Sequence, residues 1–352
     1  MRNLSAIRTM RSRQRGFSLV EIMVAITLSL ILLGGVLAVM YSSKVTYLQN
    51  DRVARIQENG RAALELILRD LRGAGFPGCA QPIAGLFNIR NILNNPTNVA
   101  WNLAQPVYGF EGASGSWTPA LDTTLIPNAT INNDIIAVRT IPAGAPSMRV
   151  SAIVNPTDSI SVTKDVGERL ADGAPAIISD CGNASIFVVS AFTPDVDDTA
   201  AAIDRSTTGG PPTNATTNLG ATFSPGARVA PINTIVYYVA PDTPGTGPSL
   251  WRVVSDEAPQ EIIAGVEALQ VKYGVDTDNN TTVNQYVNAN AVTDWSQVVS
   301  VSLALLIRSA EANSQTVDSR TYTLLDTNVG PYNDRFQRSL FTTTVTLRNR
   351  TT

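Results

Sequence analysis

The longest uninterrupted apolar segment of the chain lies near its N-terminus. Residues 22–43 contain no charged side chain. About 22 residues with a rise of about 1.5 Å each form a helix of about 33 Å, and the hydrocarbon core of a bilayer is about 30 Å thick. The pattern therefore predicts a helix that can span a membrane.

Hydrophobic residues recur every three or four positions over residues 44–72, with charged residues between them. This spacing is typical of an amphipathic helix. Gly60 interrupts the pattern at modest cost, and the Gly- and Pro-rich residues 73–78 predict the end of the helix. We expect one long helix over residues 17–72, whose apolar stripe packs on the protein's own head and whose candidate weak point is Gly34-Gly35.

Residues 73–352 alternate between β-branched or aromatic runs and clusters rich in Pro, Gly, Asn or Asp. Such runs predict strands. The predicted strands are residues 134–139, 176–179, 185–189, 234–239, 250–254, 298–308, 320–325 and 340–347, with residues 261–273 as a strand that has a leading turn. Long surface loops are predicted for residues 92–130, 191–231 and 240–249. The fold class is therefore α+β, with a long N-terminal helical stem and a β-rich head. The pattern does not decide between one sheet and two subdomains.

The residues before the apolar segment are basic. Five arginines and no acidic residue precede Gly16. Lys and Arg favour the cytoplasmic side of a membrane, so the residues after Lys44 are expected on the opposite side. A secretory signal peptide is cut after its apolar region, whereas the processing-like site Arg15-Gly16-Phe17 comes before it. The apolar segment is therefore expected to stay in the mature protein, unless the segment is a plain anchor and the Gly-Phe junction is accidental.

Glu21 is a charged residue that a plain membrane anchor does not explain. It is the only charged residue between Phe17 and Ser43. An ionised carboxylate at the start of a membrane helix is costly without a partner, so it indicates a functional site. We expect the partner to be a free α-amine.

Composition excludes several classes of function. The chain of 352 residues contains no histidine, which removes Ser-His-Asp and Cys-His catalysis and most zinc sites. The sequence shows no paired-acid motif or phosphate-binding glycine loop, so we expect no enzyme activity, cofactor or metal. The net charge of −3 becomes about −8 when the five leader arginines are lost, because 21 basic residues then face 29 acidic ones. No basic patch suggests nucleic acid as a partner.

The two cysteines, Cys79 and Cys181, both follow the membrane segment. In an oxidising compartment a disulfide that closes a loop of about 100 residues stabilises by several kcal/mol. We expect a Cys79–Cys181 disulfide, and the alternative is a pair of buried thiols.

The segment Asp276-Thr-Asp278-Asn279-Asn280 is similar to the start of a calcium loop. The glycine expected at the sixth position is Thr281, and the glutamate expected at the twelfth is Val287. A polar turn is therefore predicted in preference to a calcium site.

Residues 16–21, with the sequence GFSLVE, resemble the processing site of type IV prepilins and type II secretion pseudopilins. The resemblance implies cleavage after Gly16 by a prepilin peptidase, which also N-methylates Phe17. It further implies that Glu21 pairs with the N-terminal amine of a neighbouring subunit during assembly. The resemblance also implies a pilin-like lollipop shape, with the long helix as the stem and the β-rich part as the head. The proline that major pilins usually carry midway through the membrane half of this helix is missing here.

Motifs in the head are similar to those of the PilW family of minor pilins. They are Phe76-Pro-Gly-Cys79, Asp180-Cys181 with Ile186-Phe187, Gly265-Val-Glu267, Tyr273-Gly-Val-Asp276, Asp294-Trp295 and Val345-Thr-Leu-Arg-Asn349. The family implies a low-copy subunit that primes pilus assembly, supports twitching motility and can sit at the pilus tip. Its expected partners are other minor pilins, the major pilin, the prepilin peptidase and the inner-membrane assembly platform. The alternatives are a minor pseudopilin of a type II secretion system and a tip adhesin or receptor.

These expectations divide the chain into four parts. Residues 1–16 are a cleaved leader, residues 17–43 a transmembrane and filament-core helix, residues 44–72 its amphipathic continuation, and residues 73–352 the head. The protein is expected in the inner membrane with a periplasmic head, and later in the pilus fibre.

Overall fold

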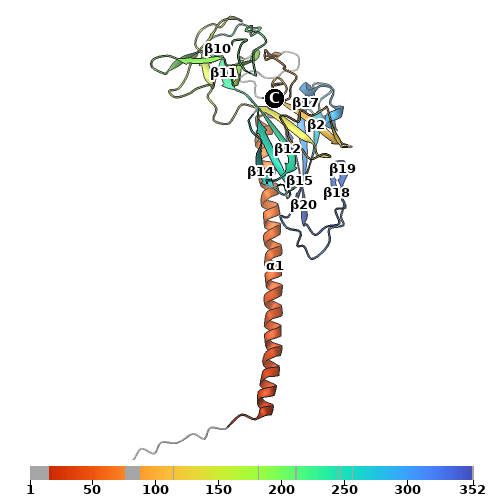
Figure 1. The fold of residues 1–352 in the computed structure, drawn as a ribbon. Coiled ribbons are helices and arrows are strands. Elements are labelled where there is room, and N and C mark those ends of the chain that lie inside the picture. The colour runs from red at the N-terminus through yellow and green to blue at the C-terminus, as the bar shows by residue number, and fades with distance from the viewer. Residues whose placement is uncertain are drawn as a thin grey trace, which may run out of the picture. The chain divides into compact units, whose positions relative to one another are not determined.

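The computed structural model describes residues 16–75, 88–113, 115–180, 182–210, 212–243, 245, 247–255 and 257–350. The chain forms two compact units, residues 1–52 and residues 53–352, which are described separately. A single helix, α1, covers Leu19–Gly73 and belongs to both units. It continues through Gly34 and Gly35 without a break in its helical assignment. The long N-terminal helix followed by a β-rich head confirms the predicted α+β fold class (Figure 1).

In the first unit, α1 is exposed along nearly its whole length. Large hydrophobic side chains such as Leu19, Ile31, Leu32 and Val39 are each at least two-thirds exposed. The helix is long and apolar enough to cross a membrane by length and composition. Its exposed apolar surface is what a membrane or a bundle of neighbouring helices would cover.

In the second unit, α1 packs on the head along the predicted apolar stripe. Its buried residues are Ile56, Gly60, Ala63, Ile67, Asp70 and Leu71. The hydrophobic members of this set share one core with two β-sheets. The buried Asp70 accepts a hydrogen bond from the Tyr237 hydroxyl at 2.6 Å, and Arg252 lies 3.7 Å from the same carboxylate. The helix is thus fixed to the head by both apolar packing and a buried polar contact.

A six-stranded sheet lies against α1 in the order β14-β13-β12-β4-β2-β3. Its strands are β2 (Val107–Ala113), β3 (Ser116–Thr118), β4 (Ile135–Thr140), β12 (Asn233–Pro241), β13 (Pro248–Val254) and β14 (Gln260–Ala264). All neighbouring pairs are antiparallel. One face contributes Ile136, Val138, Ile235 and Tyr237 to the core shared with α1.

A four-stranded antiparallel sheet completes that core in the order β16-β15-β17-β20. Its strands are β15 (Val266–Val275), β16 (Gln285–Val287), β17 (Val298–Arg308) and β20 (Arg338–Thr346). The hairpin of β18 (Tyr322–Leu324) and β19 (Thr327–Val329) supplies Leu324 to a small cluster with Ala304 and Leu306 of β17. The 3-10 turns are η1 (Ala289–Ala291), η2 (Trp295–Gln297) and η3 (Arg348–Arg350).

An eight-stranded sheet forms a separate layer with its own core, in the order β1-β8-β7-β11-β5-β6-β10-β9. Its strands are β1 (Asn88–Asn91), β5 (Met148–Val150), β6 (Ile160–Thr163), β7 (Pro175–Ser179), β8 (Asn183–Val188), β9 (Ala191–Pro194), β10 (Ala200–Asp204) and β11 (Arg228–Pro231). The β1–β8 pair is parallel, and every other pair is antiparallel.

This eight-stranded sheet is an insertion into the rest of the head. Thr140 at the end of β4 and Asn233 at the start of β12 are register partners, so the chain leaves and returns at adjacent points. The chain also returns to an adjacent point after an earlier segment, between Gly75 and Pro106. A Cβ on Gly75 would lie 2.8 Å from the Cβ of Pro106. We call residues 88–105 and 141–232 the insertion lobe. The head is one compact unit, in which the eight-stranded sheet has a hydrophobic core of its own.

Eight predicted strands are present, although the run predicted over residues 320–325 shortens to the three-residue β18. Two of the predicted long loops are wrong. Residues 92–130 contain β2 and β3, and residues 191–231 contain β9, β10 and β11. β2 is interrupted by Gly109 and Gly112, and β10 is rich in alanine, so neither has the β-branched composition that indicates a strand. Residues 261–273 form two strands, β14 and β15, separated by Gly265 at a φ of 86°.

Gly60 lies at a position on α1 where a larger residue would clash with the Phe341 ring. A Cβ built there would lie 2.6 Å from Cδ2 of Phe341 on β20. In an exposed helix, Gly→Ala stabilises by up to about 1 kcal/mol. Here we expect Gly60→Ala to destabilise the protein by about 1–3 kcal/mol, because overpacking displaces the Phe341 ring. Urea unfolding of the detergent-solubilised chain measures the change.

The matched control for this prediction is the same substitution in a Phe341→Ala background. Without the ring, Gly60→Ala should become neutral or stabilising, so the two substitutions should be strongly coupled. Equal effects of Gly60→Ala in both backgrounds would contradict the role assigned to this glycine.

Candidate assembly site

The residues of the predicted processing site lie directly before α1. Gly16 and Phe17 are non-helical and exposed, and the helix begins at Leu19. Ser18 caps it, because the Ser18 hydroxyl accepts a hydrogen bond from the backbone N–H of Glu21 at 3.1 Å. The Ser18 carbonyl also accepts bonds from the N–H groups of Glu21 and Ile22. This cap was not predicted, although a serine three residues before a glutamate is a known helix-start signal.

Glu21 is exposed in the first turn of α1. A carboxylate in this position interacts favourably with the positive end of the helix dipole. Phe17, Glu21, Ala25 and Ser29 line one side of the helix together with Leu33. Glu21 is thus presented at the end of an otherwise uncharged strip, close to the residue that would carry the new N-terminal amine after cleavage.

Cys79 and Cys181 lie outside the described residues, so their disulfide stays a prediction. The described strands show which elements flank the two cysteines in the sequence. Cys79 precedes β1, and Cys181 lies between β7 and β8. A bridge between them would tie the stretch that leads out of α1 to the insertion lobe.

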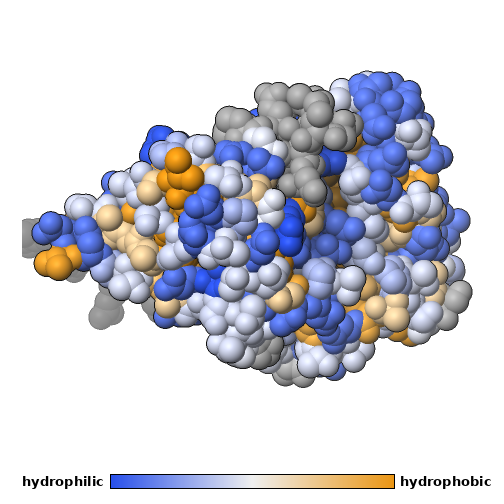
Figure 2. Space-filling view, turned by 90° about the horizontal axis from the view of Figure 1, so that it is seen from above, coloured by the Kyte–Doolittle hydropathy of each residue, from blue (hydrophilic) through white to orange (hydrophobic). Residues whose placement is uncertain are grey.

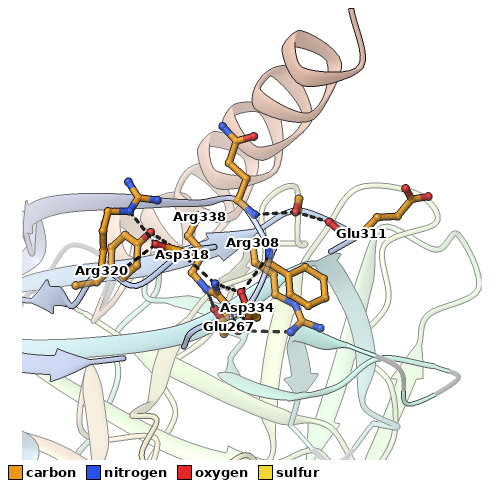
Figure 3. A network of polar contacts seen from close by, with 11 residues as sticks. Glu267, Arg308, Glu311, Asp318, Arg320, Asp334 and Arg338 are labelled. Atoms are coloured by element: carbon orange, nitrogen blue, oxygen red, sulfur yellow. Dashed lines mark hydrogen bonds and ion pairs between the residues drawn. The ribbon is translucent and has the colours of Figure 1, made fainter. Parts of the chain in front are cut away.

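A buried arginine organises the end of the four-stranded sheet. The Arg338 side chain is fully buried, and Figure 3 shows Glu267, Asp318 and Asp334 converging on it. Its guanidinium donates to Glu267 at 2.5 and 3.0 Å and to Asp334 at 2.7 Å through two nitrogens. Asp318 Oδ2 lies 3.3 Å away, and the Tyr332 ring packs 3.8 Å from the guanidinium carbon. The network joins β15 and β20 to the segment between β17 and β20.

The hydrogen bonds and charges in this network lower the pKa values of Asp318 and Asp334. Burial alone would raise the pKa of Asp318, but hydrogen bonds from Arg320 and Tyr322 outweigh burial and lower it to about 2. The hydrogen bond from Arg338 lowers the pKa of Asp334. Both carboxylates are therefore ionised at neutral pH and depend on their cationic partners.

A second polar cluster joins the six-stranded and four-stranded sheets. Asp134 accepts hydrogen bonds from the backbone N–H groups of Gly112 at 3.0 Å and Val271 at 2.8 Å. Asn133 accepts one from the Leu269 N–H at 2.8 Å. Burial, with the nearby charge of Glu111, raises the pKa of Asp134 to about 7, although the two backbone bonds oppose the shift. These contacts are structural, because each replaces a ladder bond where the two sheets meet.

The calcium-like segment forms a hydrogen-bonded turn. The carboxylate of Asp276 accepts from the backbone N–H groups of Asn280 at 3.1 Å and Thr281 at 2.7 Å. Asp278 accepts from the Asn280 amide at 2.9 Å. Among the described residues, no group of three or more His, Cys, Asp or Glu side chains is placed to hold a metal ion.

Two family models match the chain. Residues 11–37 match the prokaryotic N-terminal methylation motif, which covers Gly16, Phe17, Glu21 and the first part of α1. This motif, ahead of an exposed apolar helix and a β-rich head, defines a type IV pilin-like protein. Residues 236–349, from β12 to η3, match the type IV pilus-assembly protein W. The C-terminal third of the chain is thus similar to the PilW family, and the two matches together support a minor pilin of type IV pili.

The matches leave residues 38–235 uncovered, including the whole insertion lobe. No curated protein and no solved structure matches the chain. The Arg338 network lies within the PilW match, since all of its residues fall between Val266 and Thr346. The N-terminal motif and the apolar helix fit a pilin anchored in the inner membrane, and similarity to type IV pilins implies contact with other pilus components.

Proposed function

We propose that this protein is a minor pilin that helps to initiate assembly of type IV pili and is incorporated into the filament at its tip, in support of twitching motility. A prepilin peptidase would remove residues 1–16 and methylate Phe17. Residues 17–43 would hold the subunit in the inner membrane and later in the filament core. Residues 44–72 would continue the stem, and residues 73–352 would form a periplasmic and then extracellular head.

The observation that carries this proposal is the position of Glu21. It lies in the first capped turn of α1, on the same side as Phe17, and is followed by an uncharged exposed segment. In an apolar environment an isolated carboxylate is costly, and a neighbouring α-amine would neutralise it. Assembly would thus proceed by extraction from the membrane and pairing of Glu21 with the Phe17 amine of the next subunit.

The proposed partners are other minor pilins, the major pilin, the peptidase and the inner-membrane assembly platform. No catalytic role is assigned, and the absence of histidine from the chain supports a structural function. Figure 2 shows one face of the head on which hydrophilic residues predominate and coloured hydrophobic residues occur singly or in small groups. Contacts on this face would therefore be mainly polar.

An in-frame deletion of the gene tests the proposal. Surface pili and twitching should be lost or strongly reduced, whereas release of type II secretion substrates should be unchanged. Complementation with the intact chain should restore pili. Normal piliation with lost secretion would instead assign the chain to the pseudopilins. An intact phenotype on both counts would overturn the assembly role and favour a tip adhesin or receptor.

A further inference from the structure

The edge strands of the head differ in the features that hinder pairing with a strand of another chain. An unpaired edge presents free N–H and C=O groups, and proteins usually shorten such edges or place charges or proline on them. β14 carries Glu261, β9 ends in Pro194 and β1 carries Arg90. β3 and β16 are each three residues long. Each of these five outer edges of the three large sheets is therefore at most five residues long and is either very short or interrupted by a charged residue or a proline.

The sixth edge is β20, and its only such feature is the buried Arg338 at its first position. β20 is nine residues long, and residues 339–346 contain neither a charged residue nor a proline. It pairs with β17 on one side through Arg308↔Arg338 to Ser300↔Thr346. No main-chain partner contacts its other side within the part of the chain that the structure describes. Thr342, Thr344 and Thr346 are exposed along it. Such an edge is a template for another strand.

The direction of β20 relative to the stem follows from two contacts. Phe341, near the start of β20, packs where a Gly60 side chain would be. Asn349, just after β20, donates its amide N–H to the carbonyl of Ala74 at 2.9 Å. Because Gly60 precedes Ala74 along α1, β20 runs in the same direction as the Val53–Gly73 part of the helix. A strand that pairs antiparallel with β20 must run in the opposite direction.

We propose that the outer edge of β20 pairs antiparallel with an exposed strand of a different pilus subunit, and thereby joins the two heads into one continuous sheet. The inference rests on the proposed function, because subunits that assemble into one filament would have the helices of their heads aligned. The partner strand would then run against the helix of its own head. The partner strand that fits β20 therefore has this orientation and an uncharged sequence rich in Thr and other β-branched residues.

A second copy of this chain fits the edge poorly. Two β20 strands paired antiparallel would direct the Val53–Gly73 parts of their helices in opposite directions, whereas the proposed filament requires these parts to be aligned. The other edge of the same sheet, β16, does run against the stem, because the order β16-β15-β17-β20 is antiparallel throughout. However, β16 has three residues and β20 has nine, so most of the edge would stay unpaired.

Site-specific photo-cross-linking of the full chain in piliated cells tests this proposal. A photoreactive amino acid at Thr344 should give an adduct with another pilin-like subunit, identified by mass spectrometry. The same probe at Gln260, on the protected β14 edge, is the matched control and should give none. Adding Thr342→Lys and Thr346→Lys, which place charges along β20, should reduce the Thr344 adduct by at least about tenfold. Both lysines lie on exposed positions, so membrane levels of the chain should be unchanged.

The outcomes separate this inference from the function on which it rests. If the chain is present in sheared pili but Thr344 gives no adduct, or only an adduct with a second copy, the β20 proposal is wrong and the minor-pilin function stands. An adduct that persists with both lysines in place also contradicts strand pairing. If the chain never enters pili and its deletion leaves piliation normal, both proposals fail.

Discussion

Replacing Glu21 by valine is expected to leave the protein processed and inserted in the membrane but to reduce its amount in sheared pili by at least about tenfold. Gly16 and Phe17 are unchanged in this variant, so cleavage should continue, and valine favours membrane insertion. What is lost is the carboxylate that would neutralise the Phe17 amine of the next subunit. Removal of one partner from a buried ion pair costs several kcal/mol. Immunoblots of membrane and sheared fractions measure the distribution.

The matched control is Ser29→Val, which replaces another polar residue on the same side of α1 by the same side chain. This variant should enter pili in normal amounts. Normal incorporation of Glu21→Val would remove the basis of the proposed assembly mechanism. A defect of equal size in both variants would point to helix packing and away from charge.

Replacing Arg338 by methionine is expected to destabilise the head by about 3–5 kcal/mol. The substitution keeps much of the side-chain volume but leaves Glu267, Asp318 and Asp334 without the cation that they share. Breaking a buried charge network by removing one partner has this typical cost. Urea unfolding of the detergent-solubilised chain should show a lower midpoint. Arg320→Met is the control, because the Arg320 side chain is 63% exposed, and it should cost less than about 1 kcal/mol.

The same network predicts the effect of acid. The folded-state pKa of Asp318 is about 2, below its ordinary value of 3.8, and that of Asp334 is also lowered. Their contribution to stability is therefore present above about pH 4 and is lost as the pH falls toward 2. In Arg338→Met, Asp334 loses the hydrogen bond that lowers its pKa, whereas Asp318 keeps its bonds from Arg320 and Tyr322. The difference from the native chain should therefore shrink over that range by the contribution of Asp334. A constant difference between pH 6 and pH 2 would contradict the electrostatic explanation and leave packing as the cause.

The residues proposed for processing and assembly are close together in the sequence, so the sequence alone was enough to propose them. Gly16, Phe17 and Glu21 lie within six residues, and the uncharged segment follows directly. Ser18 could have been identified from the same six residues, because its cap depends on a spacing of three. The apolar stripe that contains the buried Ile56, Ile67 and Leu71 could also be predicted from the sequence, because a helix repeats every 3.6 residues whatever it packs against.

The sequence by itself determined the long helix, its apolar and amphipathic halves, the candidate assembly residues and most central strands. It could not decide contacts between distant residues, because nothing in a local pattern fixes which strands become neighbours. Arg338 is hydrogen-bonded to Glu267, which is 71 residues away in the sequence. A glycine is required at position 60 only because the Phe341 ring packs against that point of α1. The insertion lobe depends on Thr140 and Asn233 being partners in one sheet. The open edge of β20 was likewise decided by tertiary structure, because a strand is an edge only when the sheet order leaves one side unpaired.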